Sequence, residues 1–503
     1  MFSAFANIFK IPELRARVLF TLALLAIVRV GAAIPLPGVD PSVVQRFVEH
    51  GGREVNALTA LVTAFSGGAV AACSILALGI MPYISASIMV QLLSAVVPRL
   101  SKMSREPGGR QKINQYTRYI TIVLCLIQGF FIARGLKDPA NNMFLQGMSK
   151  FLDENKLSLV PAGATFGYYF VAITILTAGT MFLMWLGEQI TERGIGNGTS
   201  LIISVNILSD LPMALVKTFQ SYIKPKEPAQ AMILVGLMVF FVLTVAAIIV
   251  LTQAVRKIAI NYAKRQIGRK VMGGQSTHLP IKLNYAGVMP IIFASAIISF
   301  PAMILGWIFP NSDWVLRFQA VLSENGPWHW FIFFVLIFFF AYFWVATMFQ
   351  PTQISEDLKS SGGYIPGIRP GHPTAQFLDY TMNRLTFAGA IFLTIVAVVP
   401  QVMTYVSGGA IQQSTSQFFG GTSILILVGV VLDLMRQVET HLLQRNYDGF
   451  LKKGKIKGRY ESDGTLKESA IAGTSRQALL YAVLALLILL GASYSIWRKM
   501  NGN

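Results

Sequence analysis

Long apolar stretches alternate with shorter polar segments along almost the whole chain. Most of these stretches approach the roughly 20 residues that an α-helix needs to cross a bilayer. The pattern therefore predicts an all-α polytopic membrane protein with ten transmembrane helices and a candidate eleventh at the C-terminus. The apolar runs cover 18–36, 76–97, 116–134, 168–186, 199–216, 231–253, 285–309, 330–349, 385–406, 419–435 and 478–497.

Composition agrees with this interpretation. The 503 residues are 54% hydrophobic and only 13% charged, about half the charged fraction of a soluble domain. The first apolar run follows Lys10, Arg15 and Arg17, and no small-residue cleavage site comes after it. We therefore expect a retained spanning helix rather than a removed signal peptide.

Two strings occur twice in the chain. Residues 79–87, GIMPYISAS, are echoed by 287–295, GVMPIIFAS, and residues 198–203, GTSLII, by 421–426, GTSILI. The first echo pairs the second span with the seventh, and the other pairs the fifth with the tenth. Five spans per half make the second half run upside down, so we expect an inverted repeat with the functional site between the halves. The expected divisions are an N-terminal half at 1–228, a C-terminal half at 229–441, and a tail with the extra apolar segment at 442–503.

The net charge of +19 is distributed unevenly. With the N-terminus in the cytosol, most Lys and Arg residues fall in segments that face the cytosol, as the positive-inside rule requires. A basic protein can also bind nucleic acid, but we attribute most of this charge to membrane orientation. Two long cytosolic loops are expected at 253–284 and 350–384.

One segment between the first and second spans is apolar but too short to cross the membrane. It starts at Phe65 and is followed by Gly79 and Pro82, which interrupt a helix. We expect a half-helix at about 65–75 that folds into the protein from the outside. Irregular backbone at that depth is tolerated only where protein or a cavity surrounds it.

Catalytic motifs are missing. The chain has no Walker loop, HExxH or GxSxG, no metal-ligand spacing and no acidic pair within the predicted spans. Glu188 and Glu192 are expected in a Gly-rich cytosolic turn. Arg29 is the only charge well inside a span, where it should snorkel or pair locally, and Cys73 and Cys125 should be packing residues. We therefore expect neither an enzyme nor a cofactor, and an ion-coupled pump would need more ionisable groups in the membrane.

The echoes place isoleucines at symmetric positions: Ile84 matches Ile292, Ile203 matches Ile426, and Ile80 matches Val288. A ring of such side chains would exclude ions, because none of its atoms can replace a hydration shell. The alternative is that these residues are ordinary core. Polar residues on the second and third spans should face a partner helix or a wet cavity, as interhelical contacts or as part of a gate; they are Ser85, Ser87, Gln91 and Gln128.

Several longer strings are similar to one known family. They are FSGGA from residue 65, the string from Gly79, MWLGEQITERGIGNG from residue 184, NYAKRQ from residue 261, QSTHLP from residue 275 and IPGIRPG from residue 365. The chain resembles, over about residues 10–460, the SecY family of channel subunits of the bacterial Sec protein translocase.

The resemblance implies ten helices around an hourglass pore that conducts unfolded preproteins and releases membrane proteins sideways into the cytoplasmic membrane. It implies a lateral gate between spans 2 and 3 and spans 7 and 8. The pore ring would comprise Ile80, Ile84, Ile203, Ile292 and Ile426; the plug Phe65, Ser66, Gly67, Gly68, Ala71 and Ser74; and the gate Ser87, Gln91 and Gln128.

The resemblance also implies partners. The cytosolic loops would dock the ribosome, including its RNA, and the SecA motor. The residues expected there are Arg256, Lys257, Arg269, Lys270 and Arg369. Lys257 and Lys270 stand where the family pattern leads us to expect arginine, so the charge is kept without the planar fork. SecE, SecG, SecDF, signal-peptide-bearing preproteins and membrane lipid complete the expected partners.

Two rival classes fit the sequence less well than a channel does. A secondary transporter would need coordinating polar groups at the midplane, where this chain has aliphatic residues. An intramembrane hydrolase would need a nucleophile and a base within the spans. The extension at 461–503 goes beyond the family's usual end, and we assign it no role.

Overall fold

The computed structural model describes residues 12–40, 42–43, 66–70, 72–106, 108–137, 158–160, 166–209, 228–262, 265–267, 270–272, 276–309, 312–322, 327–406 and 421–452. Contacts divide the chain into a large unit, Met1–His441, and a small one, Leu442–Asn503. The eleventh apolar run, at 478–497, lies outside the described residues.

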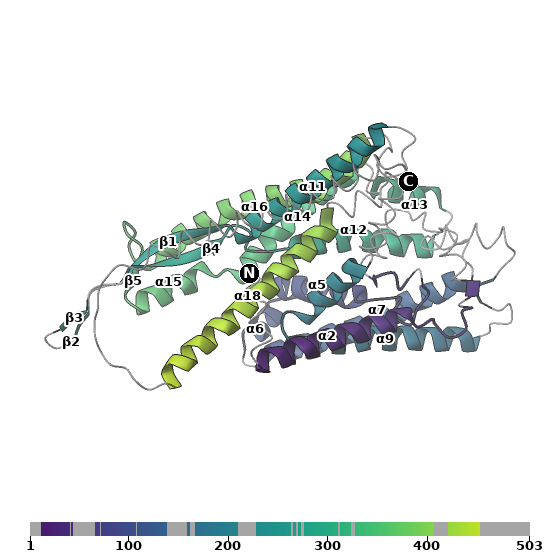
Figure 1. The fold of residues 1–503 in the computed structure, drawn as a ribbon, viewed down its shortest axis with the longest axis horizontal. Coiled ribbons are helices and arrows are strands. Elements are labelled where there is room, and N and C mark those ends of the chain that lie inside the picture. The colour runs from purple at the N-terminus through teal and green to yellow at the C-terminus, as the bar shows by residue number, and fades with distance from the viewer. Residues whose placement is uncertain are drawn as a thin grey trace, which may run out of the picture. The chain divides into compact units, whose positions relative to one another are not determined.

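Each of the first ten predicted apolar runs overlaps a helix, and Figure 1 labels all of these helices except the short Gly198–Ser209. Within the part of the chain that the structure describes, seven helices are long and apolar enough to cross a membrane, and three more are apolar but shorter. The protein is therefore a multi-pass, predominantly helical membrane protein. Its long helices are α2 (Pro12–Ala33), α7 (Gly109–Lys137), α9 (Phe166–Arg193), α11 (Pro228–Gln253), α14 (Pro327–Met348), α16 (His372–Val406) and α18 (Gly421–Lys452). The other helices are α5 (Met81–Val96), α6 (Pro98–Arg105), α12 (Met289–Ile308), α13 (Asp313–Leu322), α15 (Pro351–Ser360) and the short Gly198–Ser209.

Helices in the two predicted halves pack in the same order. In the first half α5 packs on α7, α7 packs on α9, and α9 also contacts α2. In the second half α12 packs on α14, α14 packs on α16, and α16 also contacts α11. The two sets are visible in Figure 1. The packing pattern therefore repeats along the chain, as the repeated strings lead us to expect.

The repeated strings also adopt the same local conformation. Gly79 and Gly287 both have positive φ, at 58° and 63°. The next residue in each string is a helix N-cap near φ −90° and ψ 0°, and a proline follows in the first turn of α5 and α12. Proline suits this position because the first N–H groups of a helix have no intrahelical acceptor.

A third correspondence between the halves becomes clear in the structure. A Cβ atom at Gly179 of α9 would collide with the backbone carbonyl of Ile75, and one at Gly389 of α16 would lie 3.0 Å from the carbonyl of Leu283. Ile75 and Leu283 each precede their glycine-proline string by the same number of residues. In both halves the irregular chain before the helix therefore presses against a glycine of a long helix.

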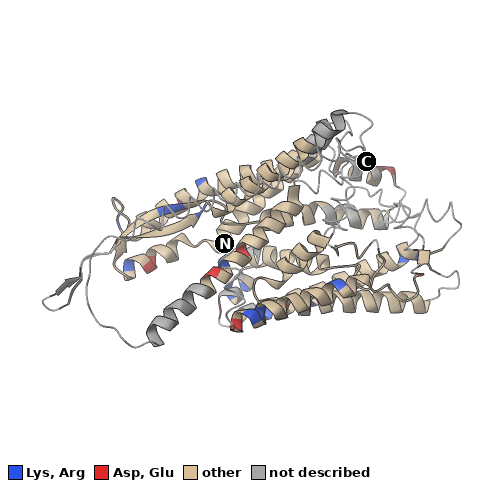
Figure 2. Ribbon diagram, viewed as in Figure 1, with Lys and Arg blue, Asp and Glu red and all other residues tan. Residues whose placement is uncertain are grey.

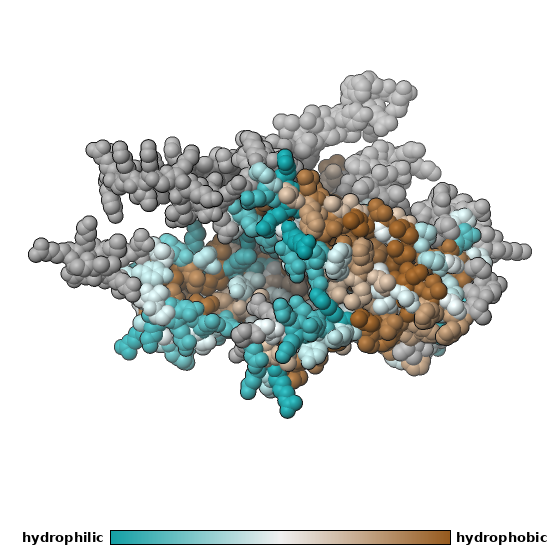
Figure 3. Space-filling model, turned by 90° about the horizontal axis from the view of Figure 1, so that it is seen from below, coloured by the Kyte–Doolittle hydropathy of each residue, from teal (hydrophilic) through white to brown (hydrophobic). Residues whose placement is uncertain are grey.

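Charge and hydropathy separate along the molecule. Figure 2 shows the described Lys, Arg, Asp and Glu residues mainly at helix ends and on the sheet, with few along the rest of the helices. Figure 3 shows a broad hydrophobic face beside a hydrophilic band. Many large apolar side chains on the helices are exposed, including Leu22, Phe170 and Leu243, as expected where lipid is the solvent.

A small sheet joins the two long polar loops. Strand β1 (Val255–Tyr262) pairs antiparallel with β4 (Ser276–Lys282), with Ile258 opposite Leu279. Strand β5 (Gly363–Tyr364) adds to the other edge of β1, so the order is β4-β1-β5. At the far end of the hairpin, β2 (Arg265–Ile267) pairs with β3 (Lys270–Met272).

The sequence predicts loops at 253–284 and 350–384 and no strands in either. The missed signal is alternation: Ile258 and Ile260 are buried while their neighbours on β1 are not, and Ile281 is buried on β4. Buried Ile258, Ile281 and Ile365 join residues of α14 and α16 in one apolar cluster. This cluster fixes both loops to the membrane-spanning part.

Candidate functional site

Five isoleucines from distant parts of the chain lie in one buried cluster. Each is at most 8% exposed, and all five belong to the largest contiguous apolar core. They come from α5 and its N-cap, from the helix Gly198–Ser209, and from α12 and α18. We call this set the isoleucine cluster: Ile80, Ile84, Ile203, Ile292 and Ile426.

The irregular starts of two helices position part of this cluster. Ile84 donates its backbone N–H to the carbonyl of Ile80 at 3.1 Å, and Ile292 donates to Val288 at 3.3 Å. Each bond closes the first turn directly after a glycine with positive φ. The repeated string therefore places an isoleucine at the same position in both halves, in the first turn of the helix: Ile84 in α5 and Ile292 in α12.

The segment 66–80 does not form the half-helix predicted for about 65–75. Ser66 is helical, and the described residues after it make a succession of turns, with Gly67 and Gly68 at φ 62° and 82°. Cys73 also has positive φ, 48°, a conformation that disfavours helix propagation in L-residues. Phe65 and Ala71, two of the predicted plug residues, lie outside the described residues.

Segment 66–80 is tied to the chain that leaves α2. Leu36 donates its N–H to the Cys73 carbonyl at 2.9 Å, and Ile75 donates to the Ile34 carbonyl at 3.0 Å. Ser74 is fully buried, and its Oγ accepts the N–H of Leu76 at 3.2 Å. These bonds add to the turns within the segment, where Ala72 donates to the Gly68 carbonyl at 3.0 Å. Together they supply partners for the backbone groups, as burial requires.

The same segment divides its side chains between two apolar clusters. Ala69 and Leu76 are buried with the isoleucine cluster, whereas Val70 and Cys73 are buried with residues of α7 and α9. Burial raises the pKa of the Cys73 thiol to about 12. A thiol in this state reacts slowly, because the thiolate is the nucleophile.

Arg29 does not snorkel away from the protein. Its Nη1 atom donates to the carbonyl of Gly67 at 3.2 Å and to Oδ1 of Asn206 at 3.5 Å. The local pairing expected from the sequence is therefore confirmed, and the partners are a turn of segment 66–80 and the helix Gly198–Ser209. Neither partner could be identified from the sequence.

The predicted gate residues lie on two neighbouring helices. On α5, Gln91 donates from Nε2 to Oγ of Ser87 at 3.1 Å, while its Oε1 atom is buried without a partner. Gln128, on α7, is 5% exposed, and α5 packs directly on α7. The three side chains are thus on adjacent helices, and two of them are bonded to each other.

The predicted docking residues are exposed where the structure describes their side chains. Arg256 and Lys257 lie on β1, and Arg369 lies in the loop between β5 and α16. That loop is held by buried Ile365 and by Ser355, whose Oγ donates to the Gly371 carbonyl. Lys270 lies in β3, and Arg269 is outside the described residues.

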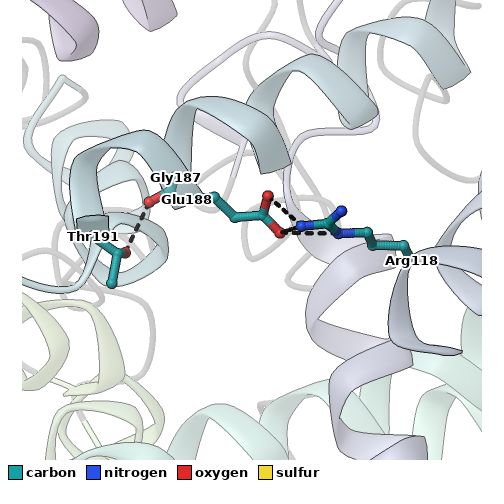
Figure 4. A network of polar contacts seen from close by, with 4 residues as sticks. All are labelled: Arg118, Gly187, Glu188 and Thr191. Carbon is teal, nitrogen blue, oxygen red and sulfur yellow. Dashed lines mark hydrogen bonds and ion pairs between the residues drawn. The ribbon is translucent and has the colours of Figure 1, made fainter. Parts of the chain in front are cut away.

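An ion pair joins α7 and α9. Arg118 Nη2 lies 2.7 Å from Oε2 of Glu188 and 2.8 Å from Oε1, as Figure 4 shows. The sequence predicts Glu188 and Glu192 in a Gly-rich turn, but both lie within α9. The turn itself begins at Gly194. Thr191 bonds the Gly187 carbonyl at 2.8 Å and accepts the N–H of Gly198 at 2.9 Å, which closes that turn.

Among the described residues, no group of three His, Cys, Asp or Glu side chains could hold a metal ion.

Comparisons with known proteins agree with one another. The family model described as SecY matches residues 74–435. Protein translocase subunit SecY of Vibrio cholerae is 40% identical over 454 residues, covering 89% of this chain and 96% of the relative. The Streptomyces scabiei protein of the same name is 43% identical over 455 residues, covering 90% and 100%.

Solved structures share the fold at low identity. A structure described as a protein conducting channel has a TM-score of 0.58 at 17% identity, covering 88% of this chain and 94% of that one. Sec61 in a canine ribosome-channel complex has a TM-score of 0.55 at 16% identity, with the same coverage.

Proposed function

Because the chain belongs to the SecY family, we propose that its isoleucine cluster is the constriction through which an unfolded polypeptide crosses the membrane. The protein is a channel subunit of the protein translocase and not an enzyme. The observation that supports the location of the constriction is the burial of five isoleucines, contributed by both halves of the repeat, in one apolar cluster.

Aliphatic side chains suit a seal that must open. They offer an ion nothing in exchange for its hydration shell, so the closed ring resists ion flow. No bond crosses the ring, so it widens when the halves separate and closes again afterwards. An unfolded polypeptide is flexible and partly apolar. It can therefore pass an aliphatic ring that excludes a hydrated ion.

Segment 66–80 is the proposed plug. Its burial between two clusters and its backbone pairing with residues 34–36 support this role. In the plugged state the segment would lie against the ring and strengthen the seal. Displacement would break those hydrogen bonds and expose the buried residues Ser66, Cys73 and Ser74.

The proposed lateral gate opens between α5 and α7 on one side and α12 and α14 on the other. Ser87, Gln91 and Gln128 would be its polar residues, and the unpaired Oε1 of Gln91 would gain a partner when the gate rearranges. A signal or transmembrane helix of ten Leu-like residues would gain about 3–6 kcal/mol on moving into lipid. That free energy would favour its sideways exit.

The proposed location is the bacterial cytoplasmic membrane, with the N-terminus in the cytosol. SecE and SecG would be its companion subunits, and SecDF, preproteins and lipid its further partners. The SecA motor and the ribosome would dock on the basic loops, which include Arg269 and Lys270. This is consistent with the ribosome complex described for the Sec61 structure.

Reconstitution tests the function. Vesicles containing this chain with bacterial SecE and SecG should import a signal-bearing preprotein into a protease-protected space when SecA and ATP are added. Omitting ATP, or deleting the signal sequence, should leave the preprotein degraded. If protection never depends on this chain, the proposed transport function is wrong.

Charge reversal of Arg256 and Lys257 is expected to weaken binding to ribosomes. Both side chains are exposed on β1 and can neutralise RNA phosphates. Binding should be measured by co-sedimentation over a range of salt concentrations. The steepness of the salt dependence should fall by about one for each phosphate that the variant no longer neutralises.

The matched control is Lys102→Glu, at an exposed position on α6 outside the docking loops. Unaltered affinity and slope in Arg256→Glu/Lys257→Glu would remove these two residues from the interface.

Cys73 reports on plug displacement. In a Cys125→Ala background, maleimide labelling of Cys73 should be slow at pH 7.5, because the thiol is buried and its pKa is raised. A trapped preprotein should accelerate labelling, because exposure returns the pKa toward about 8.5. Labelling that is equally slow with and without the trapped preprotein would show that segment 66–80 stays in place.

A further inference from the structure

The side chain of Arg29 connects three separate elements. It extends from the last turns of α2, donates to the carbonyl of Gly67 at 3.2 Å and approaches Oδ1 of Asn206 at 3.5 Å. Gly67 belongs to segment 66–80, and Asn206 belongs to the helix Gly198–Ser209. The only charge well inside a predicted span is thus directed at the turn that begins the proposed plug.

The turn is shaped around this contact. Gly67 has φ +62°, and a Cβ atom there would lie 2.5 Å from Nη1 of Arg29 and 2.8 Å from Oδ1 of Asn206. A side chain at this position would therefore both strain the backbone and displace the guanidinium. The contact needs glycine at 67 as much as it needs arginine at 29.

Arginine is well suited to this position. The Gly67 carbonyl lies in a turn rather than a helix and needs a donor where water is scarce. A guanidinium supplies a charge-assisted bond, which is stronger than a neutral one. The Gly67 and Asn206 oxygens also serve as polar partners for the guanidinium. Without such partners its charge would be costly at this depth.

Helix α2 holds the same segment at a second point. Gly31, about half a turn beyond Arg29, leaves room for Leu76: a Cβ atom at Gly31 would lie 2.7 Å from Leu76 Cδ1. Gly179 of α9 receives the neighbouring Ile75 carbonyl in close contact. Segment 66–80 is thus hydrogen-bonded to Arg29 near its start, and further along it packs closely against Gly31 of α2 and Gly179 of α9.

We propose that Arg29 is a positioning residue that anchors segment 66–80 in the closed channel through the Gly67 carbonyl, with Asn206 orienting the guanidinium. This inference rests on the proposed role of the segment as the plug. Opening would require the Arg29–Gly67 bond to break, so this bond sets part of the closed-to-open equilibrium. Its loss favours the displaced plug without removing any residue of the isoleucine cluster.

The experiment measures Cys73 labelling and resting ion leak in vesicles, in a Cys125→Ala background. Loss of a hydrogen bond to a charged group should raise both about ten- to a hundredfold in Arg29→Gln. Gly67→Ala should have a similar effect, because it disturbs the same contact from the other side. The double variant should label no faster than the faster single variant, since the two changes remove one interaction.

Two variants separate anchoring from general destabilisation. Arg134→Gln removes an exposed arginine from the end of α7 and should label at the wild-type rate. Arg29→Lys keeps the charge and should label more slowly than Arg29→Gln.

Wild-type labelling and leak in Arg29→Gln would overturn the proposal. So would equal acceleration in Arg134→Gln, or an Arg29→Lys variant that labels as fast as Arg29→Gln. Preprotein import by the unsubstituted chain is measured in parallel. Failure of that import would contradict transport itself, whereas normal import with an unresponsive Arg29→Gln variant would reject only the anchor.

Discussion

Replacement of Ile84 and Ile292 by serine is expected to raise the resting ion conductance of the channel about ten- to a hundredfold. Burial of one such aliphatic side chain is worth about 1.5–3 kcal/mol, and each 1.4 kcal/mol changes an equilibrium about tenfold. An aliphatic side chain resists contact with water by about this free energy, and serine lacks that resistance. The double variant therefore weakens the barrier to water and ions at symmetric positions of both halves. Single-channel recording in planar bilayers measures the result directly.

A matched control separates the seal from stability. Ile298 lies further along α12, is 4% exposed and belongs to the same apolar core, but not to the isoleucine cluster. Ile298→Ser should destabilise the fold without a comparable leak. Equal leak from Ile298→Ser, or unchanged conductance in Ile84→Ser/Ile292→Ser, would contradict the ring.

Replacement of Arg369 by glutamate is expected to abolish import driven by SecA while leaving the protein in the membrane. The side chain is exposed in the loop between β5 and α16, which Ile365 and Ser355 hold in place. Reversal of a charge at a docked interface costs about 2–5 kcal/mol, which reduces import at least about thirtyfold. Import into reconstituted vesicles is the measurement.

Lys359→Glu serves as the control, because Lys359 is an exposed cation at the end of the neighbouring helix α15. It should import at close to the wild-type rate. Import by Arg369→Glu at the rate of Lys359→Glu would exclude a specific role for Arg369.

The helical part of the fold can be predicted well from the sequence. Spanning length and apolar composition are local properties, and the structure has a helix at every one of the first ten apolar runs. The repeated strings also predict repeated local structure correctly, because Gly79 and Gly287 adopt the same positive-φ conformation before α5 and α12. The correspondence of Gly179 and Gly389 is also marked in the sequence, by AGTMFL at 178–183 and AGAIFL at 388–393, but this match is shorter than the other repeated strings and is easily missed.

The two local errors have a common cause. The apolar run from Phe65 predicts a half-helix at about 65–75, yet the described residues after Ser66 form turns and make two backbone hydrogen bonds with residues 34–36. Strand β5 is only two residues long and pairs with β1 from about a hundred residues earlier in the chain. Pairing with a distant segment contributes to both conformations, and, unlike the alternation on β1, such pairing leaves no local pattern in the sequence. The same holds for Arg29, whose charge is conspicuous in the sequence but whose partners are not.

Cross-linking of a trapped polypeptide tests the central claim most directly. Cysteine is placed singly at 84, 203, 292 or 426 in a variant lacking Cys73 and Cys125, and a preprotein with one cysteine is halted during import. Disulfides to the preprotein should form at all four positions but not at Leu176→Cys, a buried position of α9 in the other apolar cluster. If the four positions cross-link no better than position 176, the isoleucine cluster is ordinary core and not the passage.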